Sequence, residues 1–451
     1  MKTKKAYSLA LAAVMASSVL WGCGSSSTDP GTGAAEASDS GTKEAGGGQT
    51  LRVTVQAWMM GKYDFERIAK EFEEENPGVK VVYNQVDNVD VTSSMLEWSQ
   101  GKTNCDLALG GDRSETVPYA ANDYVVEFTD ENFFNGDFTK DKFIGSFLES
   151  GNADGVQYMI PLLGEVLGCV VNIPMMQEAG YVAEDQTITA PADWNEMYEY
   201  AKNLTKDGQT GLAVDWGNNM AVKAYDACVM GANGNLYESD GNTLNFTAGP
   251  VKNMLQVWQD LVKDGYTTTD VFADADANRT NFKAGRVAMH IAPASRWIEA
   301  GELLGAENVG VMPIPGTDTH GSVSYIHGAV IPKASENQEL AIKFIKDKLL
   351  QEQFQTDSMN SYGKMSPMKA HYEKLDNPYW PTVLDFTEKA TTPPLYKDYT
   401  KLDTNMQIEL QKMLSGASTV DEFSANMSKF MTTIDLSTGT VSYTHLRAHE
   451  T

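Results

Sequence analysis

Aromatic and hydrogen-bonding side chains follow several of the strands that the sequence predicts. Aromatic rings can cover the apolar faces of a small polyhydroxylated molecule, and carboxylates, amides and guanidinium groups can bond its hydroxyls. In open α/β sheets, ligands bind beyond the carboxyl ends of the strands. We therefore select residues near these strand ends as candidate ligand contacts. They are Trp58, Tyr63, Asp64, Asp112, Arg113, Trp216, Asn218, Ser295, Arg296 and Trp297.

Each candidate also has an ordinary structural role that the sequence leaves open. A tryptophan is more often a packed residue than a ligand platform, and we assign Trp194, Trp258 and Trp380 to packing. Asp112 and Arg113 could simply pair with each other on the surface. The interpretation as ligand contacts therefore depends on whether the fold gathers these residues in one place.

Motifs for metal binding and catalysis are incomplete in this chain. Residues 274–278 start like a calcium loop, but Arg279 replaces the usual Gly and Gly285 replaces the bidentate Glu. His445 and His449 have the spacing of a metalloprotease helix without its Glu. The sequence has no Gly-x-Ser-x-Gly elbow and no Walker loop. We expect no metal, no cofactor and no enzymatic activity.

Hydrophobic patterns predict the α/β elements that must position these candidates. Residues 51–57 alternate like a strand, residues 65–72 have helical spacing, and residues 79–82 and 105–109 are further strands. Strand, helix and strand at this spacing favour parallel pairing in an α/β layer. Later predicted strands are residues 167–171, 211–215, 287–291 and 309–312, and later predicted helices lie over residues 194–204, 254–262 and 341–349.

The N-terminal residues have the pattern of an exported, lipid-anchored protein. Three lysines precede an apolar stretch over residues 8–21, which fits a signal-peptide core and is too short to span a bilayer. Leu-Trp-Gly-Cys at residues 20–23 resembles a lipobox, so residues 1–22 are the predicted signal peptide and Cys23 the predicted lipidation site. The alternative is an ordinary secretory peptide with a chance cysteine.

Residues 23–50 form the predicted linker behind the lipid anchor. The segment is rich in Gly, Ser and Thr, and it contains no Val, Ile, Leu or aromatic residue. Such a composition cannot bury a core and is typical of a flexible tether. Several acyl chains on one cysteine would make the anchoring durable.

Charge and length restrict the function of the remaining chain. The net charge of −26 argues against a nucleic-acid partner, because binding there requires neutralisation of phosphates. About 400 residues exceed one comfortable core and suggest two lobes. With Cys23 lipidated, Cys105, Cys169 and Cys228 remain, so at most one disulfide can form among them.

Six short segments between residues 51 and 435 occur in the order of one protein family. They are FEEENPGVKV (72–81), GVQYMIP (155–161) with VVN (170–172), PADW (191–194), FKAGRVAM (282–289), MPIPG (312–316) and GASTVDE (416–422). Through them the chain resembles the bacterial extracellular solute-binding proteins of family 1, the maltose-binding-protein-like sugar-binding lipoproteins of ABC transporters.

The resemblance implies an α/β periplasmic-binding-protein fold of type II, in which hinge segments join two lobes around a ligand cleft. The chain would cross between lobes at residues 161–165, at residues 325–330 and near residues 372–380. The expected lobe 1 is residues 51–163 plus 328–373, and the expected lobe 2 is residues 166–324 plus 378–435.

The resemblance also adds candidate contacts at the crossings. Glu165 follows Pro161 in the Pro-x-x-x-Glu arrangement of maltose-binding members, whose Glu bonds a sugar hydroxyl. His327 and Gly328 lie at the second crossing. Glu165 could instead form a salt bridge at the hinge. Residues 295–297 follow a strand after which family members often carry a sugar-stacking Trp.

The implied function is that of a substrate-binding lipoprotein of an ABC importer, which captures a sugar or oligosaccharide outside the cell. Its expected partners are the sugar, the transmembrane permease subunits and, through the anchor, the membrane. No nucleic acid is expected, and the chain is expected to be a monomer. The expected location is the outer face of a cell membrane, as in Gram-positive surface lipoproteins, rather than free in a periplasm.

Two other functions remain compatible with the sequence. One is a secreted carbohydrate-active enzyme, and the other is a sugar-binding adhesin or sensor that is not coupled to transport. Residues 436–451 lack the periodicity of the preceding helix and include two of the six histidines. We interpret this tail as disordered or foreign sequence and exclude it from the fold.

Overall fold

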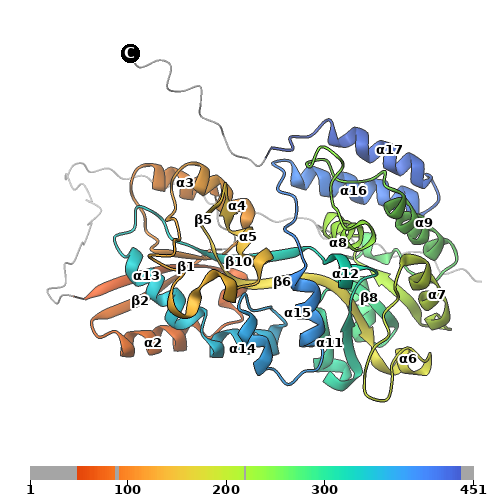
Figure 1. The fold of residues 1–451 in the computed structure, drawn as a ribbon, viewed down its shortest axis with the longest axis horizontal. Coiled ribbons are helices and arrows are strands. Elements are labelled where there is room, and N and C mark those ends of the chain that lie inside the picture. Colours follow the sequence, from red (N-terminus) through yellow and green to blue (C-terminus); the bar gives the residue numbers. More distant parts are fainter. Residues whose placement is uncertain (1–47, 87–90, 218–219, 438–451) are drawn as a thin grey trace, which may run out of the picture. The chain divides into compact units, whose positions relative to one another are not determined.

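The computed structural model describes residues 48–86, 91–217 and 220–437 (Figure 1). The predicted signal peptide, Cys23, most of the linker, Asn218 and nearly all of the predicted tail lie outside the described residues. Within the described ranges, no helix has both the length and the apolar composition required to cross a membrane. We keep the names lobe 1 and lobe 2 for the segments defined above.

Lobe 1 begins with a parallel strand–helix–strand unit. Alternate residues of β1 (Gln49–Gln56) are buried, and α2 (Phe65–Glu75) buries the face that its spacing predicts. β1 pairs in parallel with β2 (Val79–Val86) on one side and with β3 (Leu107–Gly111) on the other. The predicted strand–helix–strand pattern is therefore confirmed.

Helices cover both faces of this part of the sheet. In Figure 1, α3 and α4 lie on one side of the lobe 1 strands, and α2 and α14 lie on the other. The other elements of lobe 1 are α1 (Ala57–Met60), α3 (Val91–Ser99), α4 (Arg113–Ala121), η1 (Gly136–Phe138), η2 (Lys140–Lys142), α5 (Gly145–Ser150), β4 (Asn152–Ala153), β5 (Val156–Gln157), α13 (Gln338–Phe344), the π-helical η5 (Ile345–Leu349), α14 (Glu352–Tyr362) and η6 (Lys369–Lys374).

Lobe 2 repeats the α/β arrangement with more helices. Its elements are α6 (Ile173–Glu178), α7 (Trp194–Leu204), β7 (Thr210–Val214), α8 (Ala221–Asn233), α9 (Gly249–Lys263), η3 (Asp270–Phe272), α10 (Ala277–Lys283), β8 (Val287–Pro293), α11 (Arg296–Leu304), η4 (Ala306–Asn308), β9 (Val309–Met312), α12 (Thr317–His320), α15 (Trp380–Glu388), α16 (Tyr399–Leu414) and α17 (Val420–Met431).

One mixed sheet runs through both lobes. Its strand order is β2-β1-β3-β10-β6-β8-β7, and β9 also pairs with β6. β6 (Ile160–Asn172) has 13 residues. Its first half pairs antiparallel with β10 (Ser324–Val330), and its second half pairs antiparallel with β8 and β9. A single strand therefore leads from the sheet of lobe 1 into that of lobe 2.

The first two predicted crossings are hydrogen-bonded to each other. In the β6–β10 ladder, Tyr325 pairs with Glu165 and His327 pairs with Leu163. Residues from two distant parts of the sequence thus meet at one level of the sheet. The lobe boundaries and the third crossing, near residues 372–380, stay predictions.

Aromatic side chains fill the interior of lobe 2. Trp194 and Trp258 meet edge to face with ring centroids 5.8 Å apart, and Trp258 and Trp380 are fully buried. This confirms the assignment of these three tryptophans to packing. The three cysteines in the described part of the chain are buried as free thiols, so no disulfide joins them.

Gly328 lies where β10 changes register with its neighbours. The pairing with β6 and with β3 shifts next to this residue. A Cβ on Gly328 would collide with Met159 Cγ and lie 2.5 Å from the carbonyl oxygen of Ile160. The structure therefore gives this predicted ligand contact a packing role, because the strands can approach only if the residue has no side chain.

We expect Gly328→Ala to lower the free energy of unfolding by about 1–3 kcal/mol, because the added methyl group must displace Met159 or the β6 backbone. Urea unfolding monitored by circular dichroism measures this change. Gly145→Ala is the control, since a Cβ there would have no neighbour within 4 Å, and its effect should stay below about 0.5 kcal/mol. Equal effects in the two variants would contradict the packing argument.

Candidate ligand-binding cleft

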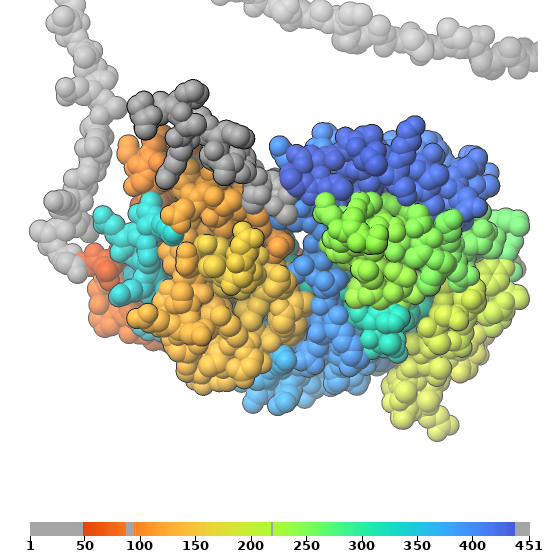
Figure 2. Space-filling view, turned by 45° about the horizontal axis from the view of Figure 1, so that its top comes forward, coloured from red at the N-terminus to blue at the C-terminus, as the bar shows by residue number. Residues whose placement is uncertain are grey.

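A cavity of about 410 Å³ lies between residues of the two lobes. Lobe 1 contributes Asp112 and Arg113 at the start of α4, and lobe 2 contributes Lys223 of α8 and residues 393–400 before and at the start of α16. Residues 324–327 of β10 lie between them. Figure 2 shows the orange and yellow surface of lobe 1 beside the light green surface around α8 and the dark blue surface of α16 and α17.

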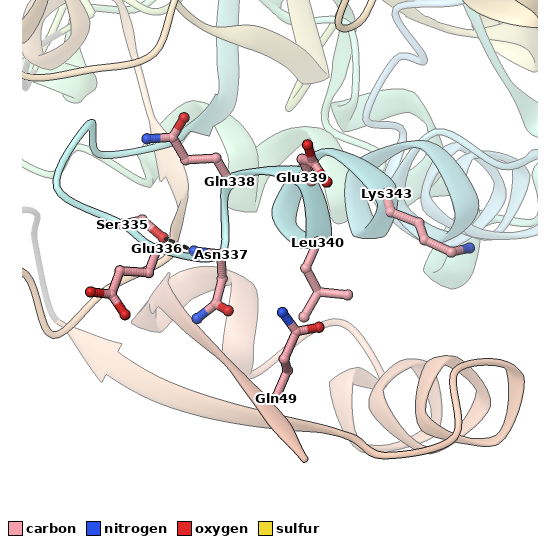
Figure 3. A pocket seen from close by; sticks show the side chains of 8 residues that line it. All are labelled: Gln49, Ser335, Glu336, Asn337, Gln338, Glu339, Leu340 and Lys343. Carbon is pink, nitrogen blue, oxygen red and sulfur yellow. Dashed lines mark hydrogen bonds between the residues drawn. The ribbon is translucent and has the colours of Figure 1, made fainter. Parts of the chain in front are cut away.

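A second depression, of about 450 Å³, lies beside the start of β1 (Figure 3). Its side chains are Gln49 and members of the segment 335–343, which is the loop before α13 and most of α13 itself. No aromatic side chain and no residue of lobe 2 lines it. The interlobe cavity is the better ligand site, because groups from two lobes and several aromatic rings converge there.

Tyrosine side chains around the interlobe cavity carry unpaired polar groups. Tyr325 and Tyr399 line the cavity, and their buried hydroxyls have no hydrogen-bond partner among the described residues. The Lys223 ammonium lies 4.9 Å from the centroid of the Tyr325 ring. A buried hydroxyl without a partner costs about 1–3 kcal/mol. A ligand or water that bonded these hydroxyls would remove that cost.

His327 connects this cavity to a second group of predicted contacts. Its ring lies 4.8 Å from the Trp58 ring, centroid to centroid, and its Nδ1 lies 2.9 Å from the carbonyl oxygen of Gly110. Because a carbonyl oxygen only accepts, Nδ1 carries a proton, and Nε2 of the neutral ring is an acceptor. Burial and the charge of Lys364 lower the pKa of His327, although two nearby carboxylates oppose the shift.

Glu165 lies at the first crossing and is bonded by both lobes. Its Oε1 accepts a hydrogen bond from the Ser295 hydroxyl in lobe 2, and its Oε2 accepts one from Lys364 in lobe 1, at 2.8 Å. Burial alone would raise the pKa of Glu165, but Lys364, Ser295 and Arg296 together outweigh burial and lower it to about 2. The side chain is 19% exposed, and an ionised carboxylate has further lone pairs for a ligand hydroxyl. A hinge salt bridge and a ligand contact are thus compatible.

Asp112 and Arg113 do not pair with each other in the described structure. Asp112 caps α4, since its Oδ1 accepts a hydrogen bond from the Ser114 amide at 2.7 Å. Arg113 Nη1 donates to the carbonyl oxygens of Glu149 and Asn152, at 2.7 Å each. Both residues line the cavity, and their contact with a ligand stays a prediction.

Two predicted tryptophan platforms are buried in lobe 2. Trp216 has no exposed surface and packs against Trp258 at 5.4 Å between centroids. Trp297 is 2% exposed and packs against Trp380 at 4.6 Å. We correct the prediction for both residues, because a ring without open surface cannot contact a ligand in this conformation.

Three further candidates have structural partners. The Tyr63 hydroxyl is buried and bonds Ser358, and Asp64 is an exposed cap of α2. The Arg296 guanidinium is bonded to the Glu299 carboxylate at 2.7 Å. Tyr63 packs and Asp64 caps a helix, and a ligand contact by either residue stays a prediction. Arg296 acts on the site through its charge, which helps to keep Glu165 ionised.

Residues 59–346 match the family model described as bacterial extracellular solute-binding protein. The chain belongs to this family. The matched segment includes residues of both lobes, and the resemblance inferred from six short motifs is confirmed. The family consists of extracytoplasmic binding proteins, and this chain shares both its sequence pattern and its fold.

Several known proteins are similar to this chain in sequence or in fold. A binding protein of Brucella abortus (strain 2308) is 24% identical over 341 residues, which are 72% of this chain and 78% of the relative. An ABC transporter solute-binding protein of Thermotoga lettingae, solved with α-D-tagatose, has a TM-score of 0.67 and 19% identity, covering 86% of this chain and 100% of its own. The sugar-binding protein MalE of Xanthomonas citri has a TM-score of 0.71 and 15% identity, covering 85% and 96%. At these identities the solved structures establish the two-lobed fold.

Sequence reasoning missed several residues of the cleft in this solute-binding protein. Tyr396 lies just before α16 and Tyr399 is its first residue, so neither follows a strand and the strand-end rule passes over both. Lys364 follows Gly363, whose φ of 64° ends α14. A glycine that ends a helix can be recognised in the sequence. The sequence does not show that Gly363 packs against the Ser295 backbone, because this contact joins distant segments.

We expect Glu165→Gln to be about 3 kcal/mol less stable than the wild type at pH 7, because the carboxylate favours the folded state. The folded pKa of about 2 lies below the unfolded value of about 4.3. This contribution is therefore complete above the unfolded pKa and is lost as the pH falls towards the folded pKa. Denaturant unfolding between pH 7 and pH 2.5 measures it, and the difference should shrink below about pH 4.

Glu178→Gln is the matched control for this substitution. Glu178 pairs with Lys206 at 2.6 Å, but its side chain is 70% exposed. An exposed pair contributes less than about 1 kcal/mol, so Glu178→Gln should change stability little at any pH. A Glu165→Gln difference that stayed constant down to pH 2.5 would contradict the depressed pKa.

Proposed function

We propose that this chain captures an uncharged sugar or oligosaccharide outside the cell and delivers it to the permease of an ABC importer. The interlobe cavity carries the proposal. Tyrosine rings, unpaired hydroxyls and side chains of both charge signs converge there from two lobes and from the strand between them.

The chemistry of the cavity suits a polyhydroxylated ring. Tyr325 and Tyr399 offer aromatic faces and unpaired hydroxyls. Trp58 does not line the cavity itself, but its larger ring packs beside His327, which does.

One carboxylate, Asp112, and three cationic side chains, Arg113, Lys223 and Lys397, line the cavity. Arg113 is already bonded to backbone carbonyl oxygens, and the ammonium groups can donate to ligand hydroxyls. A volume of about 410 Å³ falls within the ordinary range of small-molecule sites. An uncharged ligand with apolar faces and many hydroxyls matches this mixture best.

The proposed transport would use the two-lobed arrangement. A ligand that contacts both lobes favours a closed form, and it can shift the equilibrium only by its differential affinity for that form. The closed form would be the one that the permease recognises. In this proposal Cys23 is lipidated and residues 23–50 hold a monomeric binding protein at the outer face of the membrane. The chain makes and breaks no bond in its ligand.

Calorimetric titration with uncharged sugars tests the proposal. We expect at least one member of a panel containing D-tagatose, maltose and longer gluco-oligosaccharides to bind saturably in a 1:1 complex. A folded protein that bound none of them would remove sugars from the proposal. Release of reducing ends from the oligosaccharides would support a carbohydrate-active enzyme instead.

We expect Trp58→Ala to weaken the tightest complex of that panel about tenfold or more, because the aromatic face is lost. Trp58→Phe, which keeps a smaller face, should bind with intermediate affinity. Trp297→Phe is the control, since Trp297 is 2% exposed and should affect stability but not affinity. A Trp58→Ala protein with wild-type affinity would exclude this residue from the site.

A further inference from the structure

Three side chains of lobe 1 form a continuous hydrogen-bonded chain that ends at Trp58. The indole Nε1 of Trp58 donates to Gln56 Oε1 at 2.7 Å. The Gln56 amide nitrogen Nε2 donates in turn to Glu115 Oε1 at 3.3 Å. Gln56 is 7% exposed, so water has little access to the middle of this chain.

The donor and acceptor roles leave only one arrangement of the Gln56 amide. The indole N–H can only donate, so the amide oxygen must face Trp58 and the amide nitrogen must face Glu115. Burial, reinforced by the charge of Asp112, raises the pKa of Glu115 to about 8. Glu115 is therefore mostly protonated at neutral pH, and its other oxygen remains an acceptor. No unpaired charge is buried in the chain.

Two glycines at the end of β3 provide the space for these side chains. A Cβ on Gly110 would lie 2.9 Å from Met59 Sδ and 3.1 Å from Gln56 Cβ. A Cβ on Gly111 would collide with the Glu115 carboxyl. Gly110 also has a φ of 98°, a conformation that favours glycine. The Gly-Gly pair before Asp112 is thus fitted to Gln56 and Glu115.

β10 and the segment that follows α14 also contact the Trp58 ring. His327 packs on the indole at 4.8 Å, and the Lys364 ammonium lies 6.0 Å from its centroid. The carbonyl oxygen of Gly110 accepts a hydrogen bond from His327 Nδ1. Gly110 therefore helps to place both His327 and Gln56, two residues that contact the Trp58 indole. Trp58 nevertheless keeps open surface, and it is the one tryptophan in the described ranges that is not buried.

We propose that Gln56 and Glu115 are positioning residues that fix the Trp58 indole in the orientation required for stacking on the ligand. The inference rests on the proposed function, because the orientation of Trp58 matters only if a ligand binds beside it. Gln56, Glu115 and Trp58 do not line the interlobe cavity themselves, whereas His327, which packs on Trp58, does. Gln56 and Glu115 act through the indole N–H, and a pre-oriented ring loses less conformational freedom when the ligand binds.

Fluorescence quenching of the ligand-free protein tests the positioning directly. The Trp58 emission is obtained by subtracting the spectrum of Trp58→Phe, and acrylamide is the quencher. In Gln56→Met, which keeps the length of the side chain but neither hydrogen bond, the quenching constant of Trp58 should rise about twofold or more, because the released ring becomes mobile. Glu115→Leu should give a change in the same direction.

Two control variants separate positioning from general loss of stability. Glu115→Gln keeps a neutral side chain with an acceptor oxygen, so the quenching constant should remain that of the wild type. Gln355→Met removes another buried glutamine, which bonds the carbonyl oxygens of Leu162 and Leu349 and not Trp58. It should affect unfolding but not the Trp58 emission. Circular dichroism verifies that each variant is folded.

The outcomes distinguish this inference from the proposed function. A folded Gln56→Met protein with wild-type quenching, or a Glu115→Gln protein that behaves like Glu115→Leu, would overturn the positioning role whether or not sugars bind. Failure of maltose and D-tagatose to bind the wild type would instead count against the proposed function. If either sugar binds, its affinity should fall about three- to tenfold in Gln56→Met and stay unchanged in Glu115→Gln.

Discussion

The antiparallel pairing of β6 with β10 is the constraint on which the rest of the cleft depends. β6 is long enough to pair with β10 in its first half and with β8 and β9 in its second half. The ladder sets Tyr325 opposite Glu165, so a cavity residue and a carboxylate whose pKa is lowered share one level of the sheet. This close approach requires a glycine at position 328. In this sheet, the remaining strands of lobe 1 and of lobe 2 therefore lie on opposite sides of the β6–β10 pair.

This arrangement explains how the cleft tolerates charge at the joint of two lobes. Glu165 receives hydrogen bonds from Ser295 in lobe 2 and from Lys364 in lobe 1, so its charge is compensated from both sides. A buried carboxylate with only one of these donors would be costly. A movement of the lobes that separated Ser295 from Lys364 would leave Glu165 with an open acceptor position. A ligand hydroxyl could fill that position, which gives the carboxylate different partners in different lobe arrangements.

The sequence predicted the elements of the fold better than the contacts of the site. Strand alternation and helix spacing identified β1, α2, β2 and β3, since those patterns are local. The same rules could not distinguish Trp297 from Trp58, because both follow strands and only tertiary packing buries one and leaves the other partly open. Asp64 lies at the start of a predicted helix, where a carboxylate is an ordinary cap. Tyr399 was missed because its position near β10 arises from a contact between distant segments.

Buried polar groups below the cavity extend this reasoning from geometry to energy. Asp226 of α8 is fully buried, and neither of its oxygens has a hydrogen-bond partner among the described residues. Burial and the charge of Asp403 raise its pKa, so the neutral form is favoured. Asp403 itself accepts a hydrogen bond from the Val222 amide, one turn earlier on α8. The Asp226 carboxyl and the hydroxyls of Tyr325 and Tyr399 are thus buried without the hydrogen bonds that would offset the cost of removing them from water. Any solute or water that completes the hydrogen bonds is stabilised by at least part of that cost, which concentrates binding energy where the two lobes meet.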